Sequence, residues 1–186
     1  MDVEYAVIEP RFQQLRGNVL HDLNVLLQSQ SSVNYTAALL IACACEALAW
    51  FRYGDKYKGD KFLSEMMLPS QWQPAAKSLY DALRNGLAHA FETMTIVVGP
   101  RQFEIGVDWG RHAHLTFDPT HSLLCLNIFT MAEDLKQAIN RYEEELKTSG
   151  EARAKFHETI LRMKNSFRKD VSTNPRERPV WEELLK

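Results

Sequence analysis

The sequence has no long uninterrupted apolar run, only three cysteines, and no large excess of charge of either sign. The longest apolar-rich run, AALLIACACEALAWF, is shorter than the roughly 20 residues of a membrane span and contains Glu46. The start, MDVEYAVIEPRF, lacks a basic stretch followed by an apolar run. We therefore expect neither a membrane span nor a secretory signal.

The odd number of cysteines in a chain without a predicted secretory signal argues against a disulfide framework. Cys43 and Cys45 are two residues apart on a predicted helix, about 200° around its axis, so they cannot readily chelate one metal ion. These features predict a cytoplasmic protein with reduced thiols.

The formal net charge of −2 makes the molecule as a whole a poor general binder of polyanions. Any contact with nucleic acid would need a local basic surface. The length of 186 residues and the 45% hydrophobic content suit one globular domain with its own core. We find no glycine-rich phosphate loop, no G-x-S-x-G elbow, and no Cys/His arrangement for nucleophilic catalysis.

Apolar residues recur at helical spacing along most of the chain. The second of these segments is apolar on almost every side, as expected of a central helix surrounded by others. The EEELK run of residues 143–147 is interpreted as a solvated helix end. Helices are predicted at about residues 10–27, 35–51, 63–67, 72–91, 122–147 and 152–169.

Between about residues 93 and 118 the apolar residues alternate with period two, and Gly99-Pro100 and Gly110 separate the runs as turns would. This pattern predicts a small β-hairpin or three-stranded meander. The fold prediction is an all-α bundle of four to five long helices with this β insertion, spanning residues 1–169. An extended tail, 170–186, follows, with Trp181 and Leu184 as possible anchors.

The stretch DALRNGLAHAF, residues 81–91, places a glycine inside a predicted helix, at a cost of roughly 1 kcal/mol relative to alanine. A helical wheel predicts a buried face of Ala76, Leu79, Leu83, Leu87 and Ala90. Its opposite face carries Lys77, Asp81, Arg84, Asn85 and His89. Gly86 lies between the two faces, where it would let another helix approach closely.

The polar face needs no function, because an amphipathic helix normally has one. Its chemistry nevertheless suits phosphodiester cleavage without a metal, since a guanidinium binds phosphate oxygens and an imidazole moves protons near neutral pH. Arg84 to His89 reads R-N-x-x-x-H, which resembles the motif of the HEPN superfamily. The resemblance covers about residues 10–147 and implies two antiparallel helical pairs, with the motif near the end of the third main helix. An insertion after the motif and an acidic residue on the apolar second helix, here Glu46, are common companions.

Many HEPN proteins are metal-independent endoribonucleases, including toxins of toxin–antitoxin pairs, abortive-infection proteins and the nuclease halves of CRISPR effectors. The resemblance implies that His89 assists attack of a ribose 2′-hydroxyl or protonates the leaving 5′-oxygen, while Arg84 holds the phosphate and Asn85 orients it. It implies RNA as substrate, no cofactor, and a homodimer with a composite active site, since the chain holds one motif. An antitoxin protein is a possible partner. Where toxins of one subgroup carry His-x-Tyr for adenylylation, this chain has Phe91, which has no hydroxyl to modify.

Two other functions stay open. The chain could be a non-catalytic HEPN-like module that binds RNA, a nucleotide or a protein. It could also be an interaction protein that dimerises through the helix around Gly86.

Glu46 and Asp81 are predicted to support the motif. A carboxylate on an apolar helix needs a partner, and Arg84 is the first choice, with a tyrosine or an exposed position as alternatives. Asp81 could stabilise the His89 imidazolium, or it could be an ordinary solvated residue.

Basic residues form a weaker predicted RNA-binding set, which could equally be a solvated surface. His112 and His114 would share one strand face near His121, but no carboxylate or cysteine cluster completes a metal site, and none is expected. The RNA-binding set comprises Lys77, Arg162, Lys164, Arg168 and Lys169.

Overall fold

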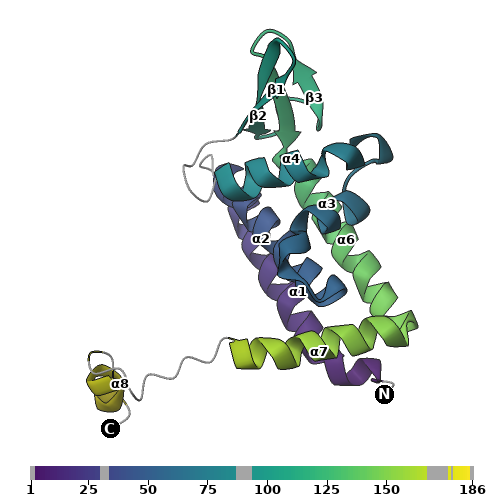
Figure 1. Cartoon of the computed structure of the whole chain (residues 1–186), viewed down its shortest axis with the longest axis vertical. Helices are drawn as coiled ribbons and strands as arrows, with labels where there is room; N and C mark the ends of the chain where they lie inside the picture. Colours follow the sequence, from purple (N-terminus) through teal and green to yellow (C-terminus); the bar gives the residue numbers. More distant parts are fainter. Residues whose placement is uncertain (1–2, 30–33, 87–93, 167–175, 177, 185–186) are drawn as a thin grey trace.

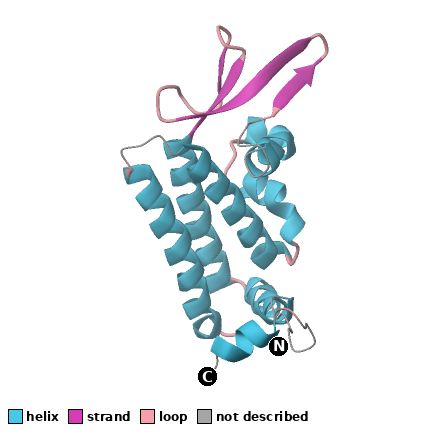
Figure 2. Cartoon of the chain, turned by 90° about the vertical axis from the view of Figure 1, so that its left-hand side faces the viewer, coloured by secondary structure: helices cyan, strands magenta, loops and turns pink. Residues whose placement is uncertain are grey.

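The computed structural model describes residues 3–29, 34–86, 94–166, 176 and 178–184. In these ranges a bundle of helices carries a small β-sheet at one end (Figures 1 and 2). The mostly helical architecture with a small β insertion confirms the coarse fold prediction.

Four long helices build the bundle, and the central one, α2, packs against the other three. α2 is the one described helix whose length and composition would suffice to cross a membrane, but half of that apolar stretch is buried inside the bundle. Neighbours on several sides therefore account for its composition, as predicted for a central helix. The long helices are α1 (Tyr5–Gln28), α2 (Asn34–Tyr53), α6 (Ile128–Thr148) and α7 (Gly150–Ser166).

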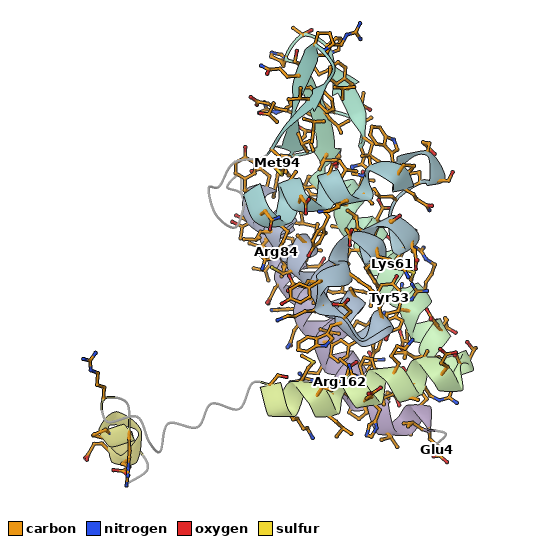
Figure 3. All side chains as sticks on the ribbon, viewed as in Figure 1. Glu4, Tyr53, Lys61, Arg84, Met94 and Arg162 are labelled. Carbon is orange, nitrogen blue, oxygen red and sulfur yellow. The ribbon has the colours of Figure 1, made fainter. Side chains whose placement is uncertain are left out.

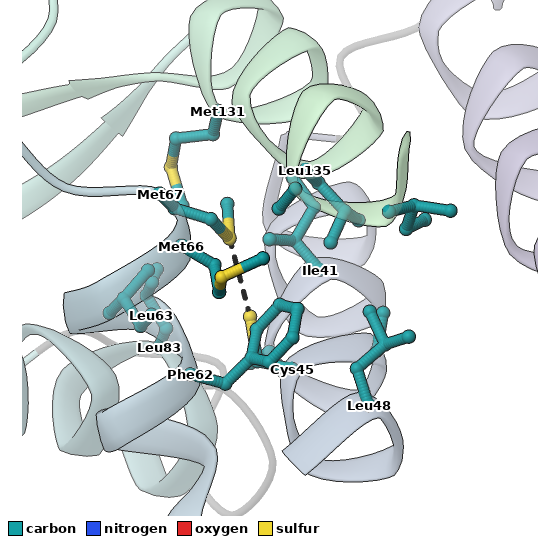
Figure 4. Close-up of a cluster of buried hydrophobic side chains, with 14 of the residues drawn as sticks. Ile41, Cys45, Leu48, Phe62, Leu63, Met66, Met67, Leu83, Met131 and Leu135 are labelled. Atoms are coloured by element: carbon teal, nitrogen blue, oxygen red, sulfur yellow. Dashed lines mark hydrogen bonds between the residues drawn. The ribbon is translucent and has the colours of Figure 1, made fainter. Parts of the chain in front are cut away.

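Short helices pack against α2 and close part of the core. The 3₁₀-helix η1 (Lys56–Lys58) leads into α3 (Gly59–Met66), which packs on α2. Figure 4 shows this part of the core, where the Cys45 thiol donates to the Met67 sulfur at 3.5 Å. Cys45 and the other two cysteines are free thiols, in agreement with the sequence.

The segment predicted as one helix over residues 72–91 has three different windings in its described part, which ends at Gly86. These are a 3₁₀-helix, η2 (Ser70–Ala75), an α-helix, α4 (Ala76–Asp81), and a π-helix, η3 (Ala82–Gly86). The prediction of a single regular helix was wrong because Pro74 lacks an N–H and the chain leaves α-helical pairing at Ala82. The predicted buried face is confirmed at Ala76, Leu79 and Leu83, whereas Leu87 and Ala90 lie outside the described residues.

Four described strands form one mixed sheet in the order β1-β2-β4-β3, in which β2 and β4 are parallel and the other pairs antiparallel. The predicted hairpin or meander ending near residue 118 was therefore too short. Pairing of β2 with β4 sets Ile105 opposite Leu124 and Val107 opposite Leu126, all buried. The strands are β1 (Thr95–Val98), β2 (Arg101–Asp108), β3 (Thr116–Asp118) and β4 (Leu123–Asn127).

Two further boundaries correct the sequence predictions. The helix predicted from residue 122 begins at Ile128, because Asn127 caps it by accepting from the backbone N–H groups of Phe129 and Thr130. The tail is not extended over Arg178–Leu184, which form the short helix α8 with a proline in its first turn. The predicted boundary at residue 169 lies outside the described residues.

Candidate functional site

Arg84 on η3 and Glu46 on α2 form an ion pair near the sheet end of the bundle (Figure 3). Arg84 Nε donates to Glu46 Oε2 at 3.0 Å, which confirms the predicted partner of this carboxylate. The two side chains are 33% and 30% exposed. A pair with this exposure adds only about 0–1 kcal/mol to stability, so its main effect is to orient the guanidinium.

Core packing decides which way this segment faces. Ala82 and Leu83 are buried, and Leu83 lies in the apolar cluster of Figure 4. Burying one leucine side chain contributes roughly 1.5–3 kcal/mol, more than the ion pair does. Arg84 and Asn85 are consequently turned toward the surface, where Asn85 is exposed.

The electrostatics of the site keep Arg84 charged. The hydrogen bond to Glu46 raises the pKa of Arg84 above its ordinary value. Among the described residues, Glu46 is its one hydrogen-bond partner, and it is bound through Nε. The two terminal Nη groups thus make no hydrogen bond to the described part of the chain.

Tyr80 is a neighbour of the pair that the sequence predictions did not include. Burial, with a further contribution from the Glu46 charge, raises the pKa of Tyr80, so its phenol stays protonated. Its ring packs on the backbone of Gly59, where a Cβ would overlap it. The sequence signal that could have identified Tyr80 is its position four residues before Arg84, since residues with this spacing share a helix face.

Lys77 and Asp81 pair with each other one helical turn apart, with Nζ and Oδ2 at 2.6 Å. Lys77 is exposed, as predicted, but its charge is shared with this carboxylate. His89 and Phe91 lie outside the described residues, so a contact between Asp81 and His89 stays a prediction.

The basic surface of α7 is smaller than its sequence suggests. Arg162 pairs with Glu158 at 2.5 Å, and Arg153 donates to backbone carbonyls of Val3, Leu146 and Lys147, which is a structural role. Lys164 is exposed and has no ion pair with a described residue. Two members of the predicted RNA-binding set, Arg168 and Lys169, lie outside the described ranges.

The three histidines near the sheet have separate partners. His112 and His114 lie in the loop after β2, not on a strand face as predicted, because β3 begins only at Thr116. His112 faces Asp108 at 3.5 Å, His121 faces Asp118 at 2.7 Å, and His114 Nδ1 accepts from the Asn127 backbone N–H. Within the part of the chain that the structure describes, no group of three or more His, Cys, Asp or Glu residues could hold a metal ion.

No family model, curated protein or solved structure matches this chain. The candidate site consists of Glu46, Tyr80, Arg84 and Asn85, together with the R-N-x3-H pattern.

Proposed function

We propose that the protein is a homodimeric, metal-independent endoribonuclease in which Arg84 and His89 are catalytic and Asn85 assists. The observation that carries the proposal is the geometry of the Arg84–Glu46 pair. It holds the guanidinium through Nε while one third of the side chain stays exposed, with Asn85 exposed beside it. Such an arrangement suits a phosphate-binding arginine, because the fork of Nη groups is oriented before the substrate arrives.

The chemistry needs a cation at the phosphate and a group for each of two proton transfers. In the proposed reaction, Arg84 binds the non-bridging phosphate oxygens and stabilises the charge that builds on them. The ribose 2′-oxygen forms a bond to phosphorus and loses its proton, the bond from phosphorus to the 5′-oxygen breaks, and the leaving oxygen gains a proton. His89 carries out one of these two proton transfers. The products are a 2′,3′-cyclic phosphate and a 5′-hydroxyl, and DNA cannot react because it lacks the 2′-hydroxyl.

The homodimer belongs to this proposal. Each chain holds one motif, so a two-fold axis that brings two motif faces together would supply a histidine for each proton transfer. The resemblance to HEPN toxins suggests a cytoplasmic role in prokaryotic defence or a toxin–antitoxin system, with RNA as substrate and an antitoxin protein as a possible partner. Phe91 makes neutralisation by adenylylation of a His-x-Tyr tyrosine a poor fit.

One observation favours a second candidate, a non-catalytic module that binds RNA, a nucleotide or a protein. The cations of this face already have partners, Arg84 with Glu46 and Lys77 with Asp81. In that case the motif arginine would serve mainly to join η3 to α2.

The deciding experiment is cleavage of a labelled, mixed-sequence RNA by the purified protein in EDTA. It compares wild type with Arg84→Ala and His89→Ala. The control variant is His21→Ala, which removes an exposed histidine on α1. Cleavage that leaves 2′,3′-cyclic phosphate ends, is lost in the first two variants and persists in the control would establish the enzyme. Equal cleavage by all four proteins would point to a contaminating nuclease and defeat the proposal. RNA binding without cleavage by wild type would favour the second candidate.

A further inference from the structure

The sheet carries a groove on the part of its face that the bundle does not cover. Its volume, about 570 Å³, falls within the roughly 300–1,000 Å³ typical of small-ligand sites. The rings of Phe103 and Phe117 meet edge to face there, with centroids 5.7 Å apart. The groove is lined by Val98, Arg101, Gln102, Phe103, Phe117, Pro119 and Ser122.

Strand register explains why Val98, Arg101, Phe103 and Phe117 share one face. Along β2, Arg101 and Phe103 are spaced two apart from buried Ile105 and therefore lie on the same face of the sheet. The β1 pairing adds Val98 opposite Arg101, and the β3 pairing with β4 adds Phe117. The sheet stands out beyond the end of the bundle (Figure 2), so the far part of this face is left uncovered and Phe117 is 50% exposed.

The groove combines an exposed aromatic ring with an uncompensated cation. Arg101 is exposed and makes no ion pair or hydrogen bond with any residue that the structure describes. Asp118, by contrast, is paired with His121. Glu104 is not among the residues that line the groove, but it lines a smaller adjoining pocket together with Gln102, Phe103 and Ser122.

This combination matches single-stranded nucleic acid better than a protein partner. Bases stack on exposed aromatic rings, and a guanidinium holds the adjoining phosphate. A stable protein interface uses roughly 20–30 residues on each side, whereas seven side chains line this groove.

We propose that the groove binds a single-stranded segment of RNA, with one base stacked on Phe117 and a phosphate held by Arg101. The choice of RNA over DNA rests on the proposed function. The sheet rises from the bundle end toward which Arg84 lies, as the labels of Met94 and Arg84 in Figure 3 show. The sheet that carries the groove and the Arg84–Glu46 pair therefore lie at the same end of the bundle.

The test is fluorescence anisotropy with two labelled 12-nucleotide probes of one mixed sequence, a single-stranded DNA and an RNA, in EDTA. The DNA reports binding alone, because it cannot undergo attack by a 2′-hydroxyl. Phe117→Ala should weaken binding of both probes at least about fivefold, and Phe117→Leu should weaken it as well, since leucine keeps apolar volume but has no ring face. Arg101→Gln should weaken binding and make the negative slope of log affinity against log salt concentration shallower by about 0.7.

Two matched controls separate the groove from a general surface effect. Phe129→Ala removes a phenylalanine that is 42% exposed and meets Trp109 edge to face at 5.1 Å. Arg111→Gln removes an exposed arginine of the loop after β2. Both should bind the probes like wild type, and thermal unfolding should show that every variant is folded.

Three results would overturn the proposal: no binding of either probe by wild type, wild-type affinity in Phe117→Ala or Phe117→Leu, or an equal loss in Phe129→Ala. Binding that depends on Phe117 and Arg101 in a protein that does not cleave RNA would support the groove while favouring the non-catalytic module over the endoribonuclease.

Discussion

Glu143 on α6 and Glu46 on α2 each pair with an arginine, but their surroundings differ. The Glu143 side chain is 10% exposed and accepts hydrogen bonds from Tyr5, Gln13 and Arg16 of α1. The Glu46 side chain is 30% exposed and, among the described residues, bonds to Arg84 alone.

The difference separates a structural joint from a site. A buried carboxylate must have its hydrogen bonds satisfied inside the protein, and the Glu143 network does this while it joins α1 to α6. The partly exposed Arg84–Glu46 pair can also be hydrated by water, and it leaves guanidinium N–H groups of Arg84 as donors for a ligand. Pairing of an arginine with a glutamate is therefore weak evidence of function until the remaining donors are considered.

The largest effect should follow from removing the guanidinium of Arg84, which pairs with the partly exposed Glu46. Arg84→Ala should slow RNA cleavage roughly 100- to 1,000-fold, as expected when one donor to a developing oxyanion is lost. Single-turnover cleavage measures this, and urea unfolding should show a stability change below about 1 kcal/mol. A loss of less than tenfold would remove Arg84 from the catalytic role.

The Glu143 network should affect stability and not cleavage. Glu143→Ala should lower the free energy of unfolding by about 2–4 kcal/mol, because Arg16 and two neutral donors lose a partly buried partner. Urea denaturation is the measurement, and cleavage by the folded fraction should be unchanged. Glu144→Ala, which removes the neighbouring carboxylate at 67% exposure, is the control. Equal costs for the two variants would mean that the network contributes no more than a surface pair.

A third prediction concerns pH and the partly buried imidazole of His114. Burial lowers the pKa of His114 from 6.5 to about 4. Between these values the unfolded chain binds a proton that the folded protein does not, so stability should fall as the pH drops from 6.5 to 4. This single group contributes at most about 1.4 kcal/mol per pH unit.

Urea unfolding at pH 7, 5.5 and 4.5 checks the His114 prediction. His114→Gln should flatten the dependence, whereas His21→Gln, which changes an exposed histidine of α1, should leave it as in wild type. An unchanged slope in His114→Gln would show that this imidazole is not the responsible group.

The smallest effect on stability is expected for Glu46→Gln. An amide oxygen can still accept from Arg84 Nε, and the pair is partly exposed, so the free energy of unfolding should change by less than about 1 kcal/mol. Cleavage should nevertheless slow, though less than in Arg84→Ala, because the guanidinium is held more loosely. Side-by-side unfolding of Glu46→Gln and Glu143→Gln sharpens the comparison, and similar costs for both would erase the distinction between open and closed pairs.

The periodicity of side chains was sufficient to predict the long helices and the central position of α2, since an apolar stripe repeats within a few residues. It also led to the Arg84–Glu46 pair, because a carboxylate on an apolar helix needs a cation and the polar face with Arg84 offered one. The EEELK interpretation was wrong at Glu143, which is buried, and at Glu145, which bonds to Arg52. Local charge pattern does not show which side of a helix end another helix will cover.

Strand β4 and π-helix η3 lie beyond the reach of local pattern. Leu123 to Leu126 is a short apolar run, which periodicity cannot assign to helix or strand, and its pairing with β2 across some 20 residues makes it a strand. The π winding of Ala82–Gly86 has no sequence signal other than the glycine that ends it. Sequence thus determined which residues belong to the core and which carry the candidate chemistry. Only the tertiary structure decided which polar groups are closed off and which stay open to a ligand, because burial depends on neighbours distant in the chain.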